Sequence, residues 1–152
     1  RGNVETRMGK VDAGLFDATL LAEAGLTRLD MKDVTRHPIS EEIIVPAPGQ
    51  AAIAVQTRDE DGELQTLLQQ IHDAKTEQEV TIERSLLKRL GGGCALPLGC
   101  VCHIESETAE LRVFYANASG TEHYLATHRS PLSDIDTLLS QLIERLQHIT
   151  TA

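Results

Sequence analysis

The sequence predicts an α/β segment followed by a separate α+β unit. In residues 1–46, two short runs with helical spacing flank an apolar run, and this order of helix, strand and helix is typical of an α/β layer. After residue 72, a helical run precedes three runs of alternating polarity and a strongly amphipathic last helix, which indicates an antiparallel sheet covered by helices. The chain has 152 residues, 41% of them hydrophobic, enough for one ordinary domain or two small ones.

The α/β segment begins with a helix that we predict from Asn3 to Asp12. Asn3 can cap this helix, its apolar residues fall on one face, and Gly14 ends it. The apolar run from Asp17 to Leu21 is predicted to be a buried strand. Residues 22–29 are predicted to form a short helix interrupted by Gly25.

The connection between the two units is predicted to be a hinge. Residues 43–57 contain two β-like runs, IIV and AIAV, and Pro46, Pro48 and Gly49 separate them. Leucines at helical spacing then predict a helix from Asp61 to Ile71.

The α+β unit is expected to start near Asp73 with a helix. Thr76 and Glu79 have the T-x-x-E spacing of a capping box at the start of that helix, and Gly91–Gly93 end it. The runs 99–105, 110–117 and 122–127 then predict three strands of an antiparallel meander, and the apolar positions from Ile135 to Leu146 predict a helix that covers the sheet.

The composition argues against several classes of protein. The formal charge of −9 repels a phosphate backbone, so nucleic acid is not an expected partner. No stretch reaches the roughly 20 apolar residues of a membrane span, and no leader is evident, so we expect a cytoplasmic protein. The three cysteines all lie between Cys94 and Cys102, which favours reduced thiols over a disulfide framework. Because the chain starts at Arg1 without a methionine, we expect a fragment of a longer protein.

Cys94 is the main candidate for covalent chemistry, because the three preceding glycines leave its thiol unshielded by neighbouring side chains. The alternative is that the glycines only end a helix and Cys94 is a buried apolar residue. A metal site formed with Cys100, Cys102 and His103 is disfavoured, because the C-x-x-C spacing is missing and neighbouring strand residues point to opposite faces. In a thiol enzyme His103 or His123 would assist Cys94, but no spacing places either histidine beside the thiol.

The arginines near the start of the chain suggest an anion site. Arg1 precedes the predicted first helix and Arg7 lies in its first turn, where free N–H groups and guanidinium forks favour carboxylates. Arg28 follows an apolar region. Solvated surface arginines remain the alternative for all three.

Four separated segments resemble the hydroxymethylbilane synthase (porphobilinogen deaminase) family. They are RGNVETR at 1–7, FDATLLAEAGLTRL at 16–29, VPAPGQAAIAVQTRDED at 45–61 and ERSLLKRLGGGCALPLG at 83–99. Their order and separations agree with the C-terminal half of the family, with a weaker match after Gly99. The resemblance implies that an N-terminal half of similar length is missing from this chain.

The resemblance also implies an architecture. The complete enzyme would have two periplasmic-binding-protein-like α/β domains and a small α+β domain. Residues 1–46 would be the latter part of domain two, residues 47–72 the hinge and a segment that packs with domain one, and residues 73–152 the domain that carries the cofactor cysteine. Without domain one, the middle segment should expose apolar surface. The family is usually monomeric.

The same resemblance assigns roles to individual residues. Cys94 would hold a dipyrromethane cofactor through a thioether, and this cofactor primes the polymerisation of four porphobilinogen molecules into hydroxymethylbilane. The acetate and propionate groups of porphobilinogen and of the growing oligopyrrole would bind Arg1, Arg7 and Arg28. Gln50 would contact the pyrroles, and Ala22 would contribute a backbone contact. The catalytic aspartate belongs to the absent half, so no catalytic residue and no metal site is assigned here, and the chain alone should be inactive.

Three departures from the family pattern suggest a rival interpretation. The family usually has glycine where this chain has Ala51, Pro48 stiffens the hinge, and Glu23 adds a carboxylate where small apolar residues are usual. A truncated or diverged homologue that binds a partner without catalysis is therefore the alternative function.

Overall fold

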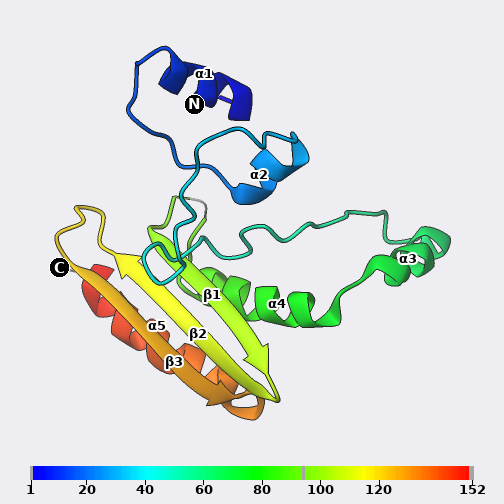
Figure 1. The fold of residues 1–152 in the computed structure, drawn as a ribbon. Helices are drawn as coiled ribbons and strands as arrows, with labels where there is room; N and C mark the ends of the chain where they lie inside the picture. Colours follow the sequence, from blue (N-terminus) through cyan, green and yellow to red (C-terminus); the bar gives the residue numbers. More distant parts are fainter. Residues whose placement is uncertain (1, 94, 151–152) are drawn as a thin grey trace. The chain divides into compact units, whose positions relative to one another are not determined.

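The computed structural model describes residues 2–93 and 95–150, and its main elements are labelled in Figure 1. The chain forms two compact units, Arg1–Ser40 and Glu41–Ala152. The elements in chain order are α1 (Val4–Asp12), α2 (Glu23–Arg28), α3 (Gly62–Leu68), the 3₁₀ helix η1 (Gln69–Ile71), α4 (Ala74–Arg89), β1 (Leu98–Glu105), β2 (Thr108–Ala116), β3 (His123–Pro131), the 3₁₀ helix η2 (Leu132–Asp134) and α5 (Ile135–Thr150).

The first unit contains two short helices joined by irregular chain. The Asn3 side chain accepts a hydrogen bond from the Thr6 amide at 2.8 Å, which confirms the predicted cap of α1. The predicted strand Asp17–Leu21 is wrong, because these residues are not in a strand and Leu20 is exposed. A strand needs a neighbour to pair its N–H and C=O groups, and residues 2–40 contain no strand that could be that neighbour. The α/β layer is therefore absent from the described part of this unit.

The start of the second unit is a chain of turns rather than strands. Both β-like runs of residues 43–57 are wrong as strand predictions, since the structure assigns only turns, a bend and irregular chain there. The predicted helix that follows is present as α3 and η1, and the Asp61 side chain caps it by accepting from the Leu64 amide at 3.3 Å.

Helix α4 begins earlier than the sequence pattern suggests. Asp73 is its N-cap and accepts from the Thr76 amide at 2.8 Å, so Thr76 lies inside the helix and the predicted capping box is wrong. This backbone hydrogen bond is the main cause of the lowered pKa of Asp73. Glu79 is therefore free to contact another element, as described below.

The three strands form an antiparallel sheet in the order β1, β2, β3, as predicted. Ser106 and Glu107 both have positive φ, at 46° and 67°, which matches the tight two-residue turn that joins β1 to β2. Helices α4 and α5 pack against the sheet (Figure 1). Their shared core includes the fully buried side chains of Leu86, Cys100, Leu111, Val113, Leu139 and Leu146. This unit is α+β, whereas the periplasmic-binding-protein-like domain stays a prediction.

Candidate functional site

The glycine run at the end of α4 forms a tight connection to β1. Gly91 has a φ of 70° and its amide donates to the Lys88 carbonyl at 3.0 Å, which ends the helix as predicted. A Cβ on Gly92 would lie 2.9 Å from Cβ of Leu96, which does not move with the side-chain rotamer, so a larger residue here would require the loop to shift. Cys94, which follows the run, lies outside the described residues.

Two open hollows flank the glycine run and share Gly92. The larger, of about 580 Å³, lies along α4 and includes the exposed cationic side chains of Arg84 and Lys88. The smaller, of about 390 Å³, lies between the loop and the end of β2, where Leu96, Pro97 and Tyr115 line it. Both hollows are open to solvent, so the described part of the connection between α4 and β1 borders exposed surface on both sides.

The other two cysteines are core residues of β1. The Cys100 and Cys102 side chains are 0% and 2% exposed. Burial raises the pKa of Cys102 to about 12 and raises the pKa of Cys100 as well, so neither forms a thiolate at neutral pH.

The histidines considered for metal or thiol chemistry have other contacts. His103 lies on the opposite face of β1 from Cys102 and forms a hydrogen bond with Glu41, with 2.6 Å between Nε2 and Oε1. The ring of His123 stacks against Phe114 at a centroid distance of 6.3 Å. Among residues 2–93 and 95–150, no group of three or more histidine, cysteine or acidic residues is arranged to hold a metal ion. In that same part of the chain no helix has the length and hydropathy of a membrane span.

Gln50 lies in two consecutive turns and its side chain is exposed. The Gln50 amide donates to the Ala47 carbonyl at 2.9 Å, with Pro48 and Gly49 between them and a Gly49 φ of 74°, the pattern of a type II turn. Pro48 therefore fits the turn by its fixed φ. In the second turn the Ala52 amide donates to the Gly49 carbonyl at 3.2 Å, and Ala51 has a φ of 68°. The left-handed backbone at position 51 favours glycine, which agrees with the glycine that the family resemblance implies for this position.

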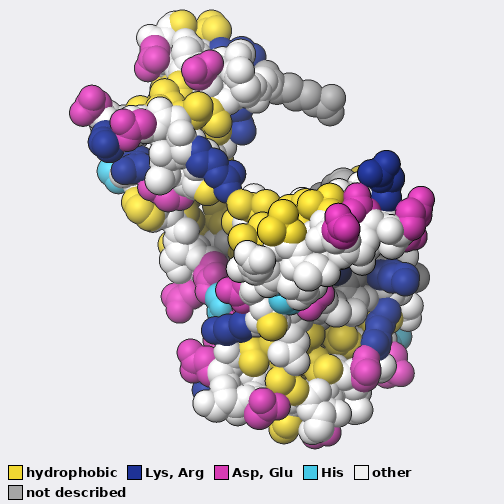
Figure 2. Space-filling model, turned by 90° about the vertical axis from the view of Figure 1, so that its right-hand side faces the viewer, with side chains coloured by type: hydrophobic (Ala, Val, Ile, Leu, Met, Phe, Trp, Pro, Cys, Tyr) yellow, Lys and Arg dark blue, Asp and Glu magenta, His cyan; other side chains and the backbone are white. Residues whose placement is uncertain are grey.

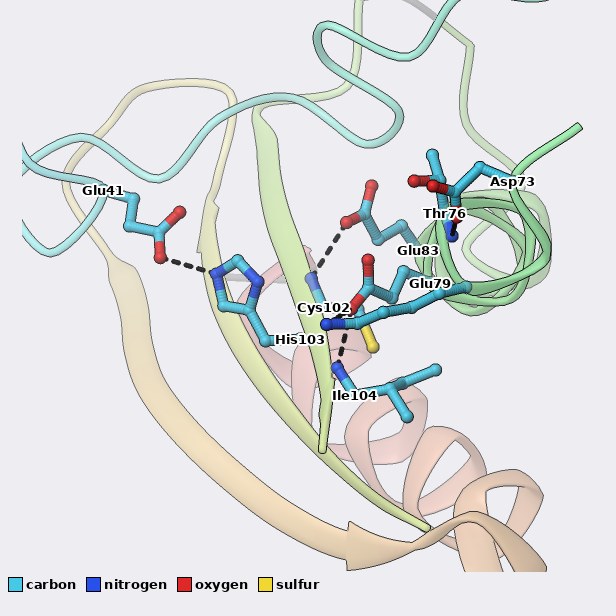
Figure 3. A network of polar contacts seen from close by, with 9 residues as sticks. Glu41, Asp73, Thr76, Glu79, Glu83, Cys102, His103 and Ile104 are labelled. Carbon is cyan, nitrogen blue, oxygen red and sulfur yellow. Dashed lines mark hydrogen bonds and ion pairs between the residues drawn. The ribbon is translucent and has the colours of Figure 1, made fainter. Parts of the chain in front are cut away.

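Two glutamates of α4 reach the backbone of neighbouring segments, a role that the sequence analysis missed (Figure 3). Glu83 is only 6% exposed; its Oε1 accepts from the Cys102 amide at 2.9 Å and its Oε2 from the Gly49 amide at 2.6 Å. Glu79 accepts from the Ile104 amide at 2.7 Å. The i, i+4 spacing of the glutamates was visible in the sequence, but their targets were not.

The predicted carboxylate-binding arginines belong to the first unit. One guanidinium nitrogen of Arg7 donates a hydrogen bond to the Leu20 carbonyl at 2.8 Å. A guanidinium has five N–H donors, so others can bind a ligand. Arg28 is exposed in the last turn of α2, and Ala22 is the exposed N-cap of the same helix. Arg1 lies outside the described residues.

The carboxylate of Glu23, which departs from the family pattern, has a cationic partner. Its Oε1 lies 2.7 Å from a guanidinium nitrogen of Arg36. The guanidinium of Arg36 therefore offsets the negative charge of Glu23 locally.

Comparison with known families identifies both parts of the chain. Residues 1–66 match the family model described as porphobilinogen deaminase, dipyromethane cofactor binding domain. Residues 77–134 match the model described as porphobilinogen deaminase, C-terminal domain. The chain belongs to the porphobilinogen deaminase family. Its function is accordingly that of hydroxymethylbilane synthase, its cofactor is dipyrromethane, and its pathway is tetrapyrrole biosynthesis. Arg7, Arg28 and Gln50 lie in the first matched segment, and Cys94 lies in the second.

Proposed function

We propose that this chain supplies the cofactor attachment and part of the substrate-binding surface of hydroxymethylbilane synthase, with Cys94 as the attachment residue. The observation that carries the proposal is the burial of the other thiols. The sequence has three cysteines, and Cys100 and Cys102 are in the core with raised pKa values. Cys94 is therefore the thiol left for a thioether, and the hollows on both sides of the glycine run give room for a ligand.

The donor set of the chain fits a cofactor that carries carboxylates. Arg7 and Arg28 offer guanidinium forks that can bind acetate and propionate groups in a bidentate manner, and Arg1 is proposed for the same role. Gln50, exposed on its double turn, would contact the pyrroles, and Ala22 at the start of α2 would offer a backbone contact. The bound cofactor supplies the pyrrole to which porphobilinogen units are added. The residues of this chain hold that acceptor and neutralise its carboxylates.

The exposed apolar surface of residues 43–71 supports a partner that covers it. Ile43, Ile53 and Ile71 are 75%, 77% and 74% exposed, and Leu67 on α3 is 58% exposed. Figure 2 shows the molecule from the side on which α3 lies, with hydrophobic side chains gathered on this face. Folded monomers rarely leave such a surface open. The partner that we propose is the N-terminal half of the enzyme, which would also bring the catalytic aspartate, so this chain alone should be inactive. A non-catalytic homologue is not favoured by the family matches.

The test is the intact mass of the chain after reconstitution with an N-terminal half of the family and porphobilinogen. We expect the mass of the chain to increase by one dipyrromethane, and Cys94→Ser should abolish this increase. Cys102→Ala is the matched control, because it removes a buried thiol and should keep the adduct. An adduct on the Cys94→Ser variant, or an active enzyme without any adduct, would refute the assignment.

A further inference from the structure

The outer edge of β1 is occupied by groups from outside the sheet. β1 is the first strand of the order β1, β2, β3, so no strand within the described residues lies beside its outer edge. The amides of Cys100, Cys102 and Ile104 nevertheless donate to Pro46 O at 2.8 Å, to Glu83 Oε1 at 2.9 Å and to Glu79 Oε1 at 2.7 Å. Carboxylates of α4 thus replace the carbonyl groups that a fourth strand would supply.

The spacing of the two glutamates matches the spacing of the strand. Residues four apart on a helix rise about 6 Å along the axis, and residues two apart on a strand are separated by about 6.6–6.8 Å. Glu79 and Glu83 can therefore reach Ile104 and Cys102 at the same time, with α4 and β1 running in opposite directions. Figure 3 shows both carboxylates pointing from α4 toward the strand.

Glu83 differs from Glu79 because it joins three segments. Its second oxygen accepts from the Gly49 amide at 2.6 Å, so the residue connects α4, β1 and the turn that displays Gln50. An ionised carboxylate suits this position, since both of its oxygens are acceptors and bonds from N–H groups to a charged acceptor are strong. Glu79 makes its second contact with Lys75, at 3.7 Å, on its own helix.

We propose that Glu83 is a positioning residue for the synthase reaction, which holds the Gln50 turn at a fixed place relative to α4 and β1, the elements that precede and follow Cys94 in the sequence. The inference rests on the proposed function, because the roles of Gln50 and Cys94 come from it. Gly49 precedes Gln50 in the same turn. If the hydrogen bond from the Gly49 amide to Glu83 is lost, the turn that carries Gln50 is no longer held in place.

The decisive variant is Glu83→Gln, with Glu79→Gln as the matched control. A glutamine has only one acceptor oxygen, so at position 83 its NH₂ group would lie against the N–H of either Gly49 or Cys102. Because both groups are donors, one of the two hydrogen bonds would be lost. At position 79 the glutamine oxygen can still accept from Ile104. Both substitutions remove one negative charge from the same face of α4, and only the first should release the Gln50 turn.

The first readout is the pH dependence of backbone amide resonances in this chain. Burial is the main reason that the pKa of Glu83 lies above its ordinary value of 4.5, and the nearby Glu79 raises this pKa further. The hydrogen bonds from Gly49 and Cys102, together with His103, act in the opposite direction. Gly49 and Cys102 should report one common titration with a midpoint above 4.5. This titration should disappear in Glu83→Gln and persist in Glu79→Gln. Separate midpoints for the two amides, or no titration in the parent chain, would overturn the proposal.

The second readout is catalysis by the reconstituted enzyme. We expect kcat/KM for porphobilinogen to fall about tenfold or more in Glu83→Gln, because a displacement of about 1 Å at a reacting site can cost about a hundredfold. The adduct on Cys94 should still form, and Glu79→Gln should retain the parent kcat/KM. Unchanged turnover in Glu83→Gln would refute the positioning role. Failure of the parent enzyme to load the cofactor would refute the proposed function instead, and the amide titrations would still test the bridge.

Discussion

Replacing Gly99 with alanine should loosen the hinge from the sheet. A Cβ at this position would lie 2.6 Å from the carbonyl oxygen of Val45 and 2.9 Å from its Cβ. Both contacts are too close, and neither atom is the end of a flexible side chain. The segment containing Val45 and Pro46 must therefore move away, which weakens the bond from the Cys100 amide to Pro46 O, now 2.8 Å.

The cost of this change follows from three contributions. Overpacking in a well-packed region costs about 1–3 kcal/mol. The loss of one hydrogen bond adds about 1 kcal/mol. Alanine recovers about 0.5–1 kcal/mol because glycine loses more backbone entropy when it is fixed in a strand. We therefore expect Gly99→Ala to lower the free energy of unfolding by about 1–3.5 kcal/mol.

Urea unfolding followed by circular dichroism measures this difference. The matched control is Gly62→Ala in α3, where a Cβ would meet nothing within 4 Å and where alanine favours the helix. The control should be as stable as the parent or slightly more stable. An unfolding midpoint of Gly99→Ala equal to that of the parent would show that the hinge does not lie against β1.

Three further predictions concern the strained turn, the thiols and the carboxylate site. Ala51→Gly should raise the free energy of unfolding by about 0.5–1 kcal/mol in urea, since relief of about 1–2 kcal/mol of left-handed strain is partly offset by unfolded-state entropy. Iodoacetamide at pH 8 should label only Cys94 in the folded chain, because Cys100 and Cys102 are buried with raised pKa values, whereas denaturation should allow three labels by mass spectrometry. Arg7→Leu in a reconstituted enzyme should slow oligopyrrole elongation, measured as the rate of hydroxymethylbilane formation, because a carboxylate loses its guanidinium partner.

Each of these predictions has a contrary outcome. Loss of stability in Ala51→Gly would mean that the backbone at this position is not left-handed. Rapid labelling of Cys100 or Cys102 in the folded chain would contradict their burial and remove the argument that singles out Cys94. Turnover unchanged by Arg7→Leu would count against its role in carboxylate binding, and Arg129→Leu is a control because Arg129 pairs with Glu110 on the sheet.

Local sequence signals predicted the elements whose stability depends on their own periodicity. The Asn3 cap, the apolar face of α5 and the alternating runs of the meander were all recognised, because capping residues and polarity periods act within a few residues. The same signals failed for Asp17–Leu21 and for the IIV and AIAV runs. An apolar run has the same appearance whether or not a neighbouring strand exists to pair with it.

The family, the α+β character of the second unit and the candidate residues could be predicted from the linear chain, because motifs and periodicity are properties of the sequence. The contacts of those residues could not, because they arise from the packing of whole elements. The tertiary structure placed Cys100 and Cys102 in the core, gave Ala51 its left-handed backbone and brought Glu83 to Gly49 and Cys102, 34 and 19 residues away. Contacts over such separations depend on how whole elements pack, and no local pattern encodes which backbone amide a glutamate will reach.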